Sequence, residues 1–261
     1  MLDNKPLGIV KKFCYLGSTT TSTTSLDEEI SARIEKAATA FGKLTKRAWN
    51  HKMLTIETKA RIYEACILST LLYGSETWTL YSRQENKLNV FHLRCLRKIL
   101  GITWQDRVTN TEVLKRAALS SMPTILCKRR LRWLGHVKRM DDNRIPKQLL
   151  HGELAQGCRQ RGRPKLRFKD TCKSSLNKCH IDAKSWEKLA EDRTAWKTSV
   201  NTGVKQLERE NIQAFEAKRQ RKKGNVPQPC NTSLICRYCN RTCLSNIGKI
   251  SHEKSCRKKT S

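Results

Sequence analysis

Four cysteine and histidine side chains near the C-terminal end of the chain have the spacing that most constrains its fold. Two residues separate Cys236 from Cys239, twelve residues follow, and three residues separate His252 from Cys256. A Cys-x2-Cys turn places two thiolates on one side of a metal ion, and two ligands one helical turn apart supply the other side. The alternative, chance clustering, is weakened because this segment has too few apolar residues to fold without a metal. We therefore predict that Cys236, Cys239, His252 and Cys256 bind Zn2+ in a small ββα-like zinc finger.

This finger differs from the two-Cys, two-His pattern in ways that bear on its function. Cys243 stands where such fingers have an aromatic core residue, so it is either a small buried side chain, which we favour, or a competing ligand. Cys230 is a further thiol that could replace a ligand. The base-reading positions hold Ser245, Gly248 and Ser251, none of which can make bidentate contacts to base edges. We expect the finger to add general affinity rather than to read a base sequence.

The charge of the chain indicates a polyanionic partner. Lys and Arg number 53 against 23 Asp and Glu, which gives a formal net charge of +30. Charge of this size attracts nucleic acid first and an anionic membrane surface second, and it is unlike that of an ordinary metabolic enzyme. We therefore expect RNA and/or DNA as the partner.

Membrane insertion and a disulfide framework are both disfavoured. The longest apolar stretch, residues 65–73, is roughly half as long as a bilayer span requires. The first residues lack the apolar run of a signal peptide. We therefore expect an intracellular protein with no membrane partner, in which the twelve cysteines are buried thiols or metal ligands.

Hydrophobic periodicity divides the chain into three regions and predicts a mainly α fold. Residues 1–139 form a helical bundle with a short N-terminal strand, residues 140–230 a basic helical linker, and residues 231–261 the zinc finger. The strand covers residues 8–16 and is followed by a Ser/Thr-rich turn at residues 18–25. Ser25 and Glu28 form a capping box at the first helix. The further helices are expected at residues 55–72, 84–100 (ending at Gly101), from Thr111 or Pro123 onward, 170–178 and 186–220.

Clusters of basic side chains are the candidate contacts to nucleic acid. A flat Arg-Gly-Arg segment can enter the narrow minor groove of A·T-rich DNA. The run at residues 218–223 fits a phosphate-contacting arm or a nuclear import signal, which favours a nuclear location, with the cytoplasm as a possible second location. Solvated loops and helix ends are the competing interpretation of these charges. The candidate residues are Arg129, Arg130, Arg132, Arg161, Arg163, Lys218, Arg219, Arg221, Lys222, Lys223, Arg257 and Lys258.

The sequence offers no catalytic centre. A polymerase needs acidic pairs on an apolar hairpin to hold two metal ions. Asp141 and Asp142 are the one adjacent Asp pair, and their charged flanks favour a surface turn. No P-loop, no Gly-x-Ser-x-Gly and no His-Glu-x-x-His motif is present. We expect the chain not to be an enzyme.

Taken together, several short motifs resemble the C-terminal part of the reverse transcriptase of non-LTR (LINE-like) retrotransposons. They are FCYLGS at residues 13–18, LLYGSETW at 71–78, RCLRKILGI at 94–102, RWLGHVKRM at 132–140, GRP at 162–164 and DRTAW at 192–196, followed by the finger. The resemblance implies a strand that grips the primer, a thumb that packs against the template–primer duplex, and a finger that binds nucleic acid. Phe168 departs from the family, where Trp is usual.

The resemblance also implies which parts are missing. The palm with its Asp-Asp motif and the endonuclease would lie upstream of residue 1. We therefore favour a zinc-containing, sequence-nonspecific nucleic-acid-binding fragment that is not catalytic by itself. Two alternatives are the accessory thumb of an active reverse transcriptase whose palm lies on another chain, and a domesticated zinc-finger regulator that reads DNA.

Overall fold

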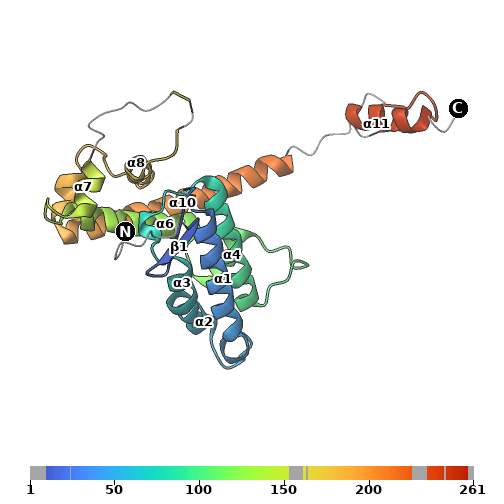
Figure 1. Ribbon diagram of the computed structural model, residues 1–261. Helices are drawn as coiled ribbons and strands as arrows, with labels where there is room; N and C mark the ends of the chain where they lie inside the picture. Colours follow the sequence, from blue (N-terminus) through green and yellow to red (C-terminus); the bar gives the residue numbers. More distant parts are fainter. Residues whose placement is uncertain are drawn as a thin grey trace. The chain divides into compact units, whose positions relative to one another are not determined.

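The computed structural model describes residues 10–23, 25–152, 161–162, 164–224, 234–243 and 245–257. They form two compact units, Met1–Ile212 and Gln213–Ser261. The described residues are mainly helical, with one short two-stranded sheet, which confirms the predicted fold class (Figure 1). Helix α10 (Arg193–Gly224) contributes residues to both units.

The first unit begins with a β-hairpin. Strand β1 (Lys12–Tyr15) pairs antiparallel with β2 (Ser18–Thr21), and Tyr15 lies opposite Ser18. The residues between the strands, Leu16 and Gly17, both have positive φ angles, 48° and 81°. Two central residues of this kind form the tight turn that joins twisted antiparallel strands. The strand predicted at residues 8–16 is confirmed over Lys12–Tyr15, and residues 8 and 9 lie outside the described residues. The prediction of a turn from residue 18 is wrong, because the turn is completed at Gly17 and Ser18 already pairs.

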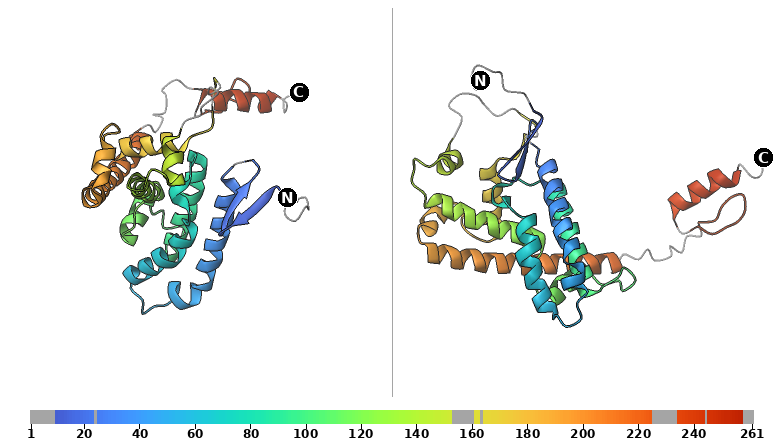
Figure 2. Two further views of the ribbon diagram at one scale, coloured as in Figure 1. Left: turned by 60° about the vertical axis from the view of Figure 1, so that its left-hand side comes forward. Right: turned by 60° about the horizontal axis from the view of Figure 1, so that its bottom comes forward.

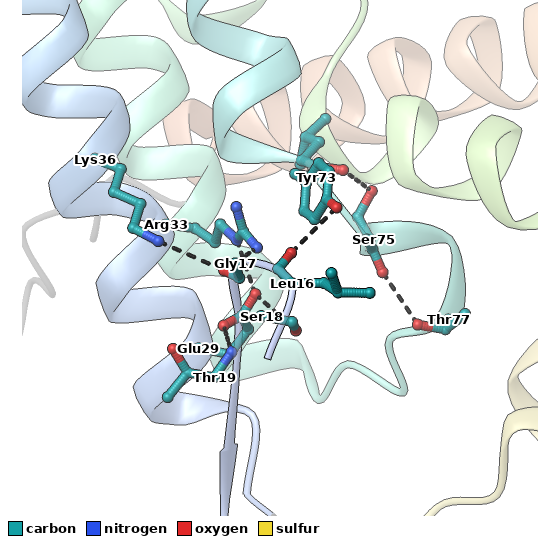
Figure 3. Close-up of polar contacts among 12 residues, drawn as sticks. Leu16, Gly17, Ser18, Thr19, Glu29, Arg33, Lys36, Tyr73, Ser75 and Thr77 are labelled. Carbon is teal, nitrogen blue, oxygen red and sulfur yellow. Dashed lines mark hydrogen bonds and ion pairs between the residues drawn. The ribbon is translucent and has the colours of Figure 1, made fainter. Parts of the chain in front are cut away.

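The hairpin lies beside helix α1 (Asp27–Lys43) in Figure 2, and a buried ion pair fixes it there. Figure 3 shows the polar contacts. Arg33 Nε lies 2.8 Å from Glu29 Oε1, and both side chains are buried. The Arg33 guanidinium also donates to the Gly17 carbonyl at 2.6 Å, and the Thr19 N–H donates to Glu29 at 2.6 Å. The Tyr73 hydroxyl donates to the Leu16 carbonyl at 3.2 Å. Both charges are thus satisfied by the hairpin that they hold in place.

The start of α1 differs from the predicted capping box. The Asp27 N–H donates to Ser25 Oγ at 3.3 Å, and Ser25 Oγ donates to the Asp27 carboxylate at 2.9 Å. The residue before the helix is Leu26, which supplies no side-chain cap. The reciprocal pairing of Ser25 with Glu28 is therefore wrong, because the helix starts one residue later than the capping box requires.

The first hydrophobic core lies among α1 and the helices that follow it. The predicted helix at residues 55–72 is one continuous helical segment, and the helix ending at Gly101 is confirmed, with a left-handed φ of 67° at that glycine. The two alternative starts of the next helix are both used, since Ala118 has a φ of 52° and separates two helices. The elements are η1 (Thr45–Trp49), α2 (Ile56–Ile62), η2 (Tyr63–Leu68), α3 (Ser69–Leu71), η3 (Ser75–Thr77), α4 (Ser82–Leu100), α5 (Asn110–Ala117) and α6 (Met122–Lys138).

A second core is built on the C-terminal half of α6. Cys127, Leu131 and Leu134 pack with residues of α7 (Ile145–His151), α8 (Phe168–Lys178), α9 (Trp186–Glu191) and α10. Helix α8 confirms the helix predicted at residues 170–178, whereas α7 was not predicted. The single helix predicted at residues 186–220 is wrong. Asp192 adopts an extended conformation, and its carboxylate accepts a 2.7 Å bond from the Thr194 N–H that starts α10.

Two of the sequence motifs, at residues 132–140 and 192–196, contact each other in this second core. Trp196 lies against Gly135 of α6, and the Trp196 indole N–H donates to the Leu131 carbonyl at 3.1 Å. A Cβ atom at residue 135 would lie 2.1 Å from Trp196 Nε1, so the approach requires glycine.

The second unit contains the last residues of α10 and the Cys/His segment. Ile235 and Thr242 form an antiparallel bridge, and helix α11 (Asn246–Arg257) follows. Among the residues that the structure describes, no helix is both long enough and apolar enough to cross a membrane.

Candidate metal centre and basic surface

The two N-terminal thiols lie on a tight turn that is held by backbone hydrogen bonds. The Cys236 N–H donates to the Arg241 carbonyl at 2.9 Å, and the Asn240 N–H donates to the Cys236 carbonyl at 3.1 Å. The Tyr238 N–H points at Cys236 Sγ at 3.4 Å. Burial would raise the pKa of the Cys236 thiol, but the backbone N–H groups of Tyr238 and Cys239 and the thiols of Cys239 and Cys256 together outweigh it and lower that pKa. The turn therefore favours the thiolate that binds metal.

Helix α11 brings the other two side chains to the same point. His252 and Cys256 are one helical turn apart, and His252 Nε2 lies 3.1 Å from Cys239 Sγ. One ligand atom from each of Cys236, Cys239, His252 and Cys256 lies within 4.8 Å of the other three. Ligands of a tetrahedral zinc ion, at about 2.0–2.3 Å from the metal, are separated by roughly 3.3–3.8 Å. These four residues could hold such a metal ion with small adjustments of their side chains.

The sequence left two other thiols, Cys243 and Cys230, as alternative zinc ligands. Cys243 is half-buried, lies outside the group of four, and its Sγ is 3.9 Å from the Arg241 carbonyl. Cys230 lies outside the described residues. Within the described part of the segment, Cys256 rather than Cys243 joins the other three ligand atoms.

Ser245, a predicted base-reading position, is used to start the helix. Its Oγ accepts a 3.0 Å hydrogen bond from the Gly248 N–H, and its carbonyl accepts one from the Lys249 N–H at 2.9 Å. This arrangement is that of a helix N-cap. With its oxygen held in this way, the hydroxyl can make at most a single contact to a base edge, which distinguishes bases less well than a bidentate contact.

The predicted nucleic-acid contacts lie in several different environments. Arg129 is partly exposed and donates to Glu76 at 2.9 Å and to the Leu72 carbonyl at 3.0 Å. Arg163 and Lys258 lie outside the described residues, and Lys222, Lys223 and Arg257 are described by their helical backbone alone. The candidates with exposed side chains are Arg132, Arg161, Lys218, Arg219 and Arg221.

The expectation that Arg130 belongs to the basic surface is wrong. Its side chain is buried, with a relative exposure of 4%, because this face of α6 packs against α8. One guanidinium nitrogen donates to Ser175 Oγ at 2.8 Å, while Nε and Nη2 have no hydrogen-bond partner among the described residues.

Two buried thiols lie close together in the same core. Cys127 Sγ lies 3.5 Å from Cys179 Sγ. The hydrogen bond with Cys179 and the charge of Arg130 contribute to lowering the pKa of Cys127 to about 7.

The acidic pair behaves as the sequence predicts. Asp142 lies in a turn between α6 and α7, its side chain is 92% exposed, and it pairs with Lys147 at 2.7 Å. Hydrogen bonding and the charge of Lys147 lower the pKa of Asp142. Among the described residues, the group of three or more possible metal ligands is Cys236, Cys239, His252 and Cys256, and Asp142 does not belong to it.

Sequence reasoning did not single out Trp104. It lies in the connection between α4 and α5 and is 84% exposed. The signal that could have identified it is an aromatic residue set among six basic residues at positions 94–116.

One curated relative is similar to the chain over much of its length. A Caenorhabditis elegans protein, named as transposon-derived, is 26% identical over 196 residues, which cover 72% of this chain and 69% of that protein. No protein family matches the chain. No solved structure matches it either.

Proposed function

We propose that this chain is a zinc-containing nucleic-acid-binding fragment, largely sequence-nonspecific and without catalysis of its own. The observation that carries the proposal is the convergence of Cys236, Cys239, His252 and Cys256 on one point in a strongly basic chain. The transposon-derived name of the relative supports a transposon-related origin. The motifs quoted above support the C-terminal part of a non-LTR reverse transcriptase as that origin.

The donor set indicates a structural role for zinc. Three thiolates and one imidazole fill all four positions of a tetrahedral Zn2+ ion, which leaves no open position for a substrate or water. When bound, the ion would connect the turn at residues 236–239 to α11. Because the segment has little apolar core, we expect its folding to depend on this connection.

RNA and/or DNA is the proposed partner, bound through its phosphates. The net charge of +30 supports it, and so do the exposed side chains of Arg132, Arg161, Lys218, Arg219 and Arg221. The capping role of Ser245 argues against base readout by the finger. We further propose a nuclear location, and a chain carrying the reverse transcriptase palm as a second partner.

The first experiment tests nucleic-acid binding by the full chain loaded with zinc. Fluorescence anisotropy with an RNA–DNA primer duplex is measured as salt is raised. We expect tight binding that weakens steeply with salt, because phosphate contacts release counterions. The slope of log affinity against log salt concentration should become less steep by roughly 1–3 in the triple variant Lys218→Gln/Arg219→Gln/Arg221→Gln. The matched control carries three similar substitutions in the other unit, Lys43→Gln/Lys46→Gln/Arg47→Gln. Binding that does not respond to salt would overturn the proposal.

The second experiment tests the zinc ligands. Zinc content is measured after purification for Cys256→Ser and for Cys243→Ser. We expect Cys256→Ser to lose the ion or bind it far more weakly, and Cys243→Ser to retain one equivalent, because the Cys243 thiol lies outside the group of four. The reverse result would assign the fourth ligand to Cys243.

A further inference from the structure

The connection between α4 and α5 presents an exposed tryptophan. Trp104 is 84% exposed, whereas Trp49, Trp78 and Trp196 are buried in the two cores. In Figure 1 this connection projects as a loop beside α4. A solvent-exposed indole does not stabilise either core. A binding role for this side chain would account for its position.

Both ends of this connection are anchored. Gly101 ends α4 with a left-handed φ of 67°, and Ile102 and Val108 pack against the first core. The Arg97 guanidinium donates to the Val108 carbonyl at 3.5 Å and to Asn110 Oδ1 at 2.6 Å. The tip of the connection therefore has little freedom to move away from α4.

The tip itself is an internally hydrogen-bonded turn. The backbone N–H and the hydroxyl of Thr103 donate to the Asp106 carboxylate at 2.7 and 2.8 Å, which lowers the pKa of Asp106. The Arg107 N–H donates to the Trp104 carbonyl at 3.3 Å. A side chain presented on such a turn binds a ligand with little loss of conformational entropy.

The chain segment on either side of Trp104 is strongly basic. Residues 94–116 contain six Lys or Arg against two acidic residues. Both carboxylates are engaged within the segment, Asp106 with Thr103 and Glu112 with Arg116 at 2.8 Å. The basic residues with exposed side chains are Arg94, Lys98, Arg107, Lys115 and Arg116.

We propose that Trp104 stacks on an unpaired base of single-stranded RNA or DNA while the neighbouring basic side chains contact its phosphates. The proposal rests on the proposed function and names a single strand as the partner of this part of the surface. A base inside a duplex has both faces covered, so along a strand an indole can stack only where bases are unpaired. A protein partner fits less well, because interface anchors lie among apolar neighbours, whereas Thr103, Gln105 and Asp106 beside this indole are polar and exposed.

The test compares wild-type protein with Trp104→Ala, using the full zinc-loaded chain and a short fluorescent single strand of mixed sequence. RNA and DNA versions are used, each with a same-length strand that lacks bases. We expect Trp104→Ala to weaken binding of the base-containing strand on the order of tenfold. Binding of the abasic strand should be unchanged, and the salt slope should be the same for both proteins.

Two further variants separate stacking from loss of apolar surface or of structure. Met53→Ala removes a side chain that is 86% exposed elsewhere in the first unit, and it should leave binding unchanged. Trp104→Phe retains an aromatic face and should restore most of the affinity. Thermal unfolding checks that each variant is folded.

The remaining outcomes distinguish the inference from the proposed function. If the wild-type protein binds the primer duplex of the first experiment but neither kind of single strand at low salt, the inference alone is overturned. If it binds neither the duplex nor a single strand, the proposed function is overturned as well. If binding is salt-dependent but equal for wild type and Trp104→Ala, stacking alone is overturned, as it would be if this indole served a protein partner. An equal loss for base-containing and abasic strands would also contradict stacking.

Discussion

His92 of α4 lies in the first core with both ring nitrogens in hydrogen bonds. The Tyr63 hydroxyl lies 2.9 Å from Nδ1, and Nε2 lies 3.2 Å from the Ser120 carbonyl. Because the carbonyl can only accept, Nε2 carries the proton and Tyr63 donates to Nδ1. Burial lowers the pKa of His92 to about 4. The ring is therefore neutral in the folded protein at neutral pH.

This histidine predicts a loss of stability in acid. Below about pH 6.5 the unfolded chain binds a proton at this residue and the folded chain does not, so the free energy of unfolding falls until pH reaches about 4. The full loss is about 3 kcal/mol. Urea unfolding at several pH values checks this, with His92→Gln expected to remove this part of the pH dependence and His136→Gln, an exposed site, expected to retain it. Equal pH profiles for wild type and His92→Gln would contradict the prediction.

The close packing at Gly135 predicts that a single methyl group added there destabilises the protein. Gly135→Ala places a methyl group 2.1 Å from Trp196 Nε1, so Trp196 or α6 must shift, at a cost of about 1–3 kcal/mol. Gly42→Ala is the matched control, since nothing lies within 4 Å of the added carbon in α1 and alanine favours a helix by up to about 1 kcal/mol. Chemical denaturation should therefore give opposite signs for the two variants. Stabilisation by Gly135→Ala would show that the close approach is wrong.

At the scale of elements, α6 connects the two cores and its N-terminus is capped by a distant helix. Glu208 of α10 accepts a hydrogen bond from the Ser121 N–H at 2.9 Å and from Ser121 Oγ at 2.7 Å. It also accepts one from the Thr124 hydroxyl, which is buried. A carboxylate at this end of a helix also interacts favourably with the helix dipole.

This capping contact predicts the effect of removing one carboxylate. Glu208→Ala should destabilise the first unit by about 1–3 kcal/mol, because it removes the acceptor of the buried Thr124 hydroxyl and of the partly buried Ser121 N–H. Glu210→Ala, two residues along α10, removes a solvent-exposed pairing with His180 at 2.9 Å and should destabilise the unit much less, because water screens exposed charges. Thermal unfolding of both variants is the measurement. A cost for Glu208→Ala no greater than for Glu210→Ala would contradict the capping role.

At the scale of the whole molecule, the two units differ in what stabilises them. Two apolar cores lie within residues 30–207, whereas the described side chains of residues 234–257 include one buried apolar side chain, Cys236. The first unit can therefore be stable through burial of apolar surface. We expect the Cys/His segment of the second unit to depend on the proposed metal instead.

Removal of zinc should therefore affect the two units differently. A strong chelator should increase amide hydrogen exchange throughout residues 234–257 and reduce the helical circular dichroism by the share of α11. The thermal transition of the first unit should stay unchanged, and added zinc should restore the protection in α11. A chelator that lowers the first unit's transition, or that leaves exchange in α11 unchanged, would refute this division.

The sequence predicts well what depends on neighbours along the chain. The spacing of Cys236, Cys239, His252 and Cys256 identifies a group that the structure brings to one point, because ligands on one turn and one helix meet through local geometry. Gly101 identifies the end of α4 because glycine adopts the left-handed conformation without strain. Hydrophobic periodicity likewise predicts the main helices, since each must bury one face.

What depends on contacts between distant segments was decided by the tertiary structure. Arg130 was expected on the surface because its neighbours are charged, yet the packing of α8 on α6 buries it. Ser18–Thr21 became a strand because β1 lies beside it and Glu29 accepts the Thr19 N–H. Local sequence carries charge, turn preference and metal-ligand spacing, but which face of a helix meets another helix depends on the shape of both. By itself the sequence determined a basic, mainly helical chain with a metal-ligand group, and the tertiary structure alone decided which basic and aromatic side chains reach solvent.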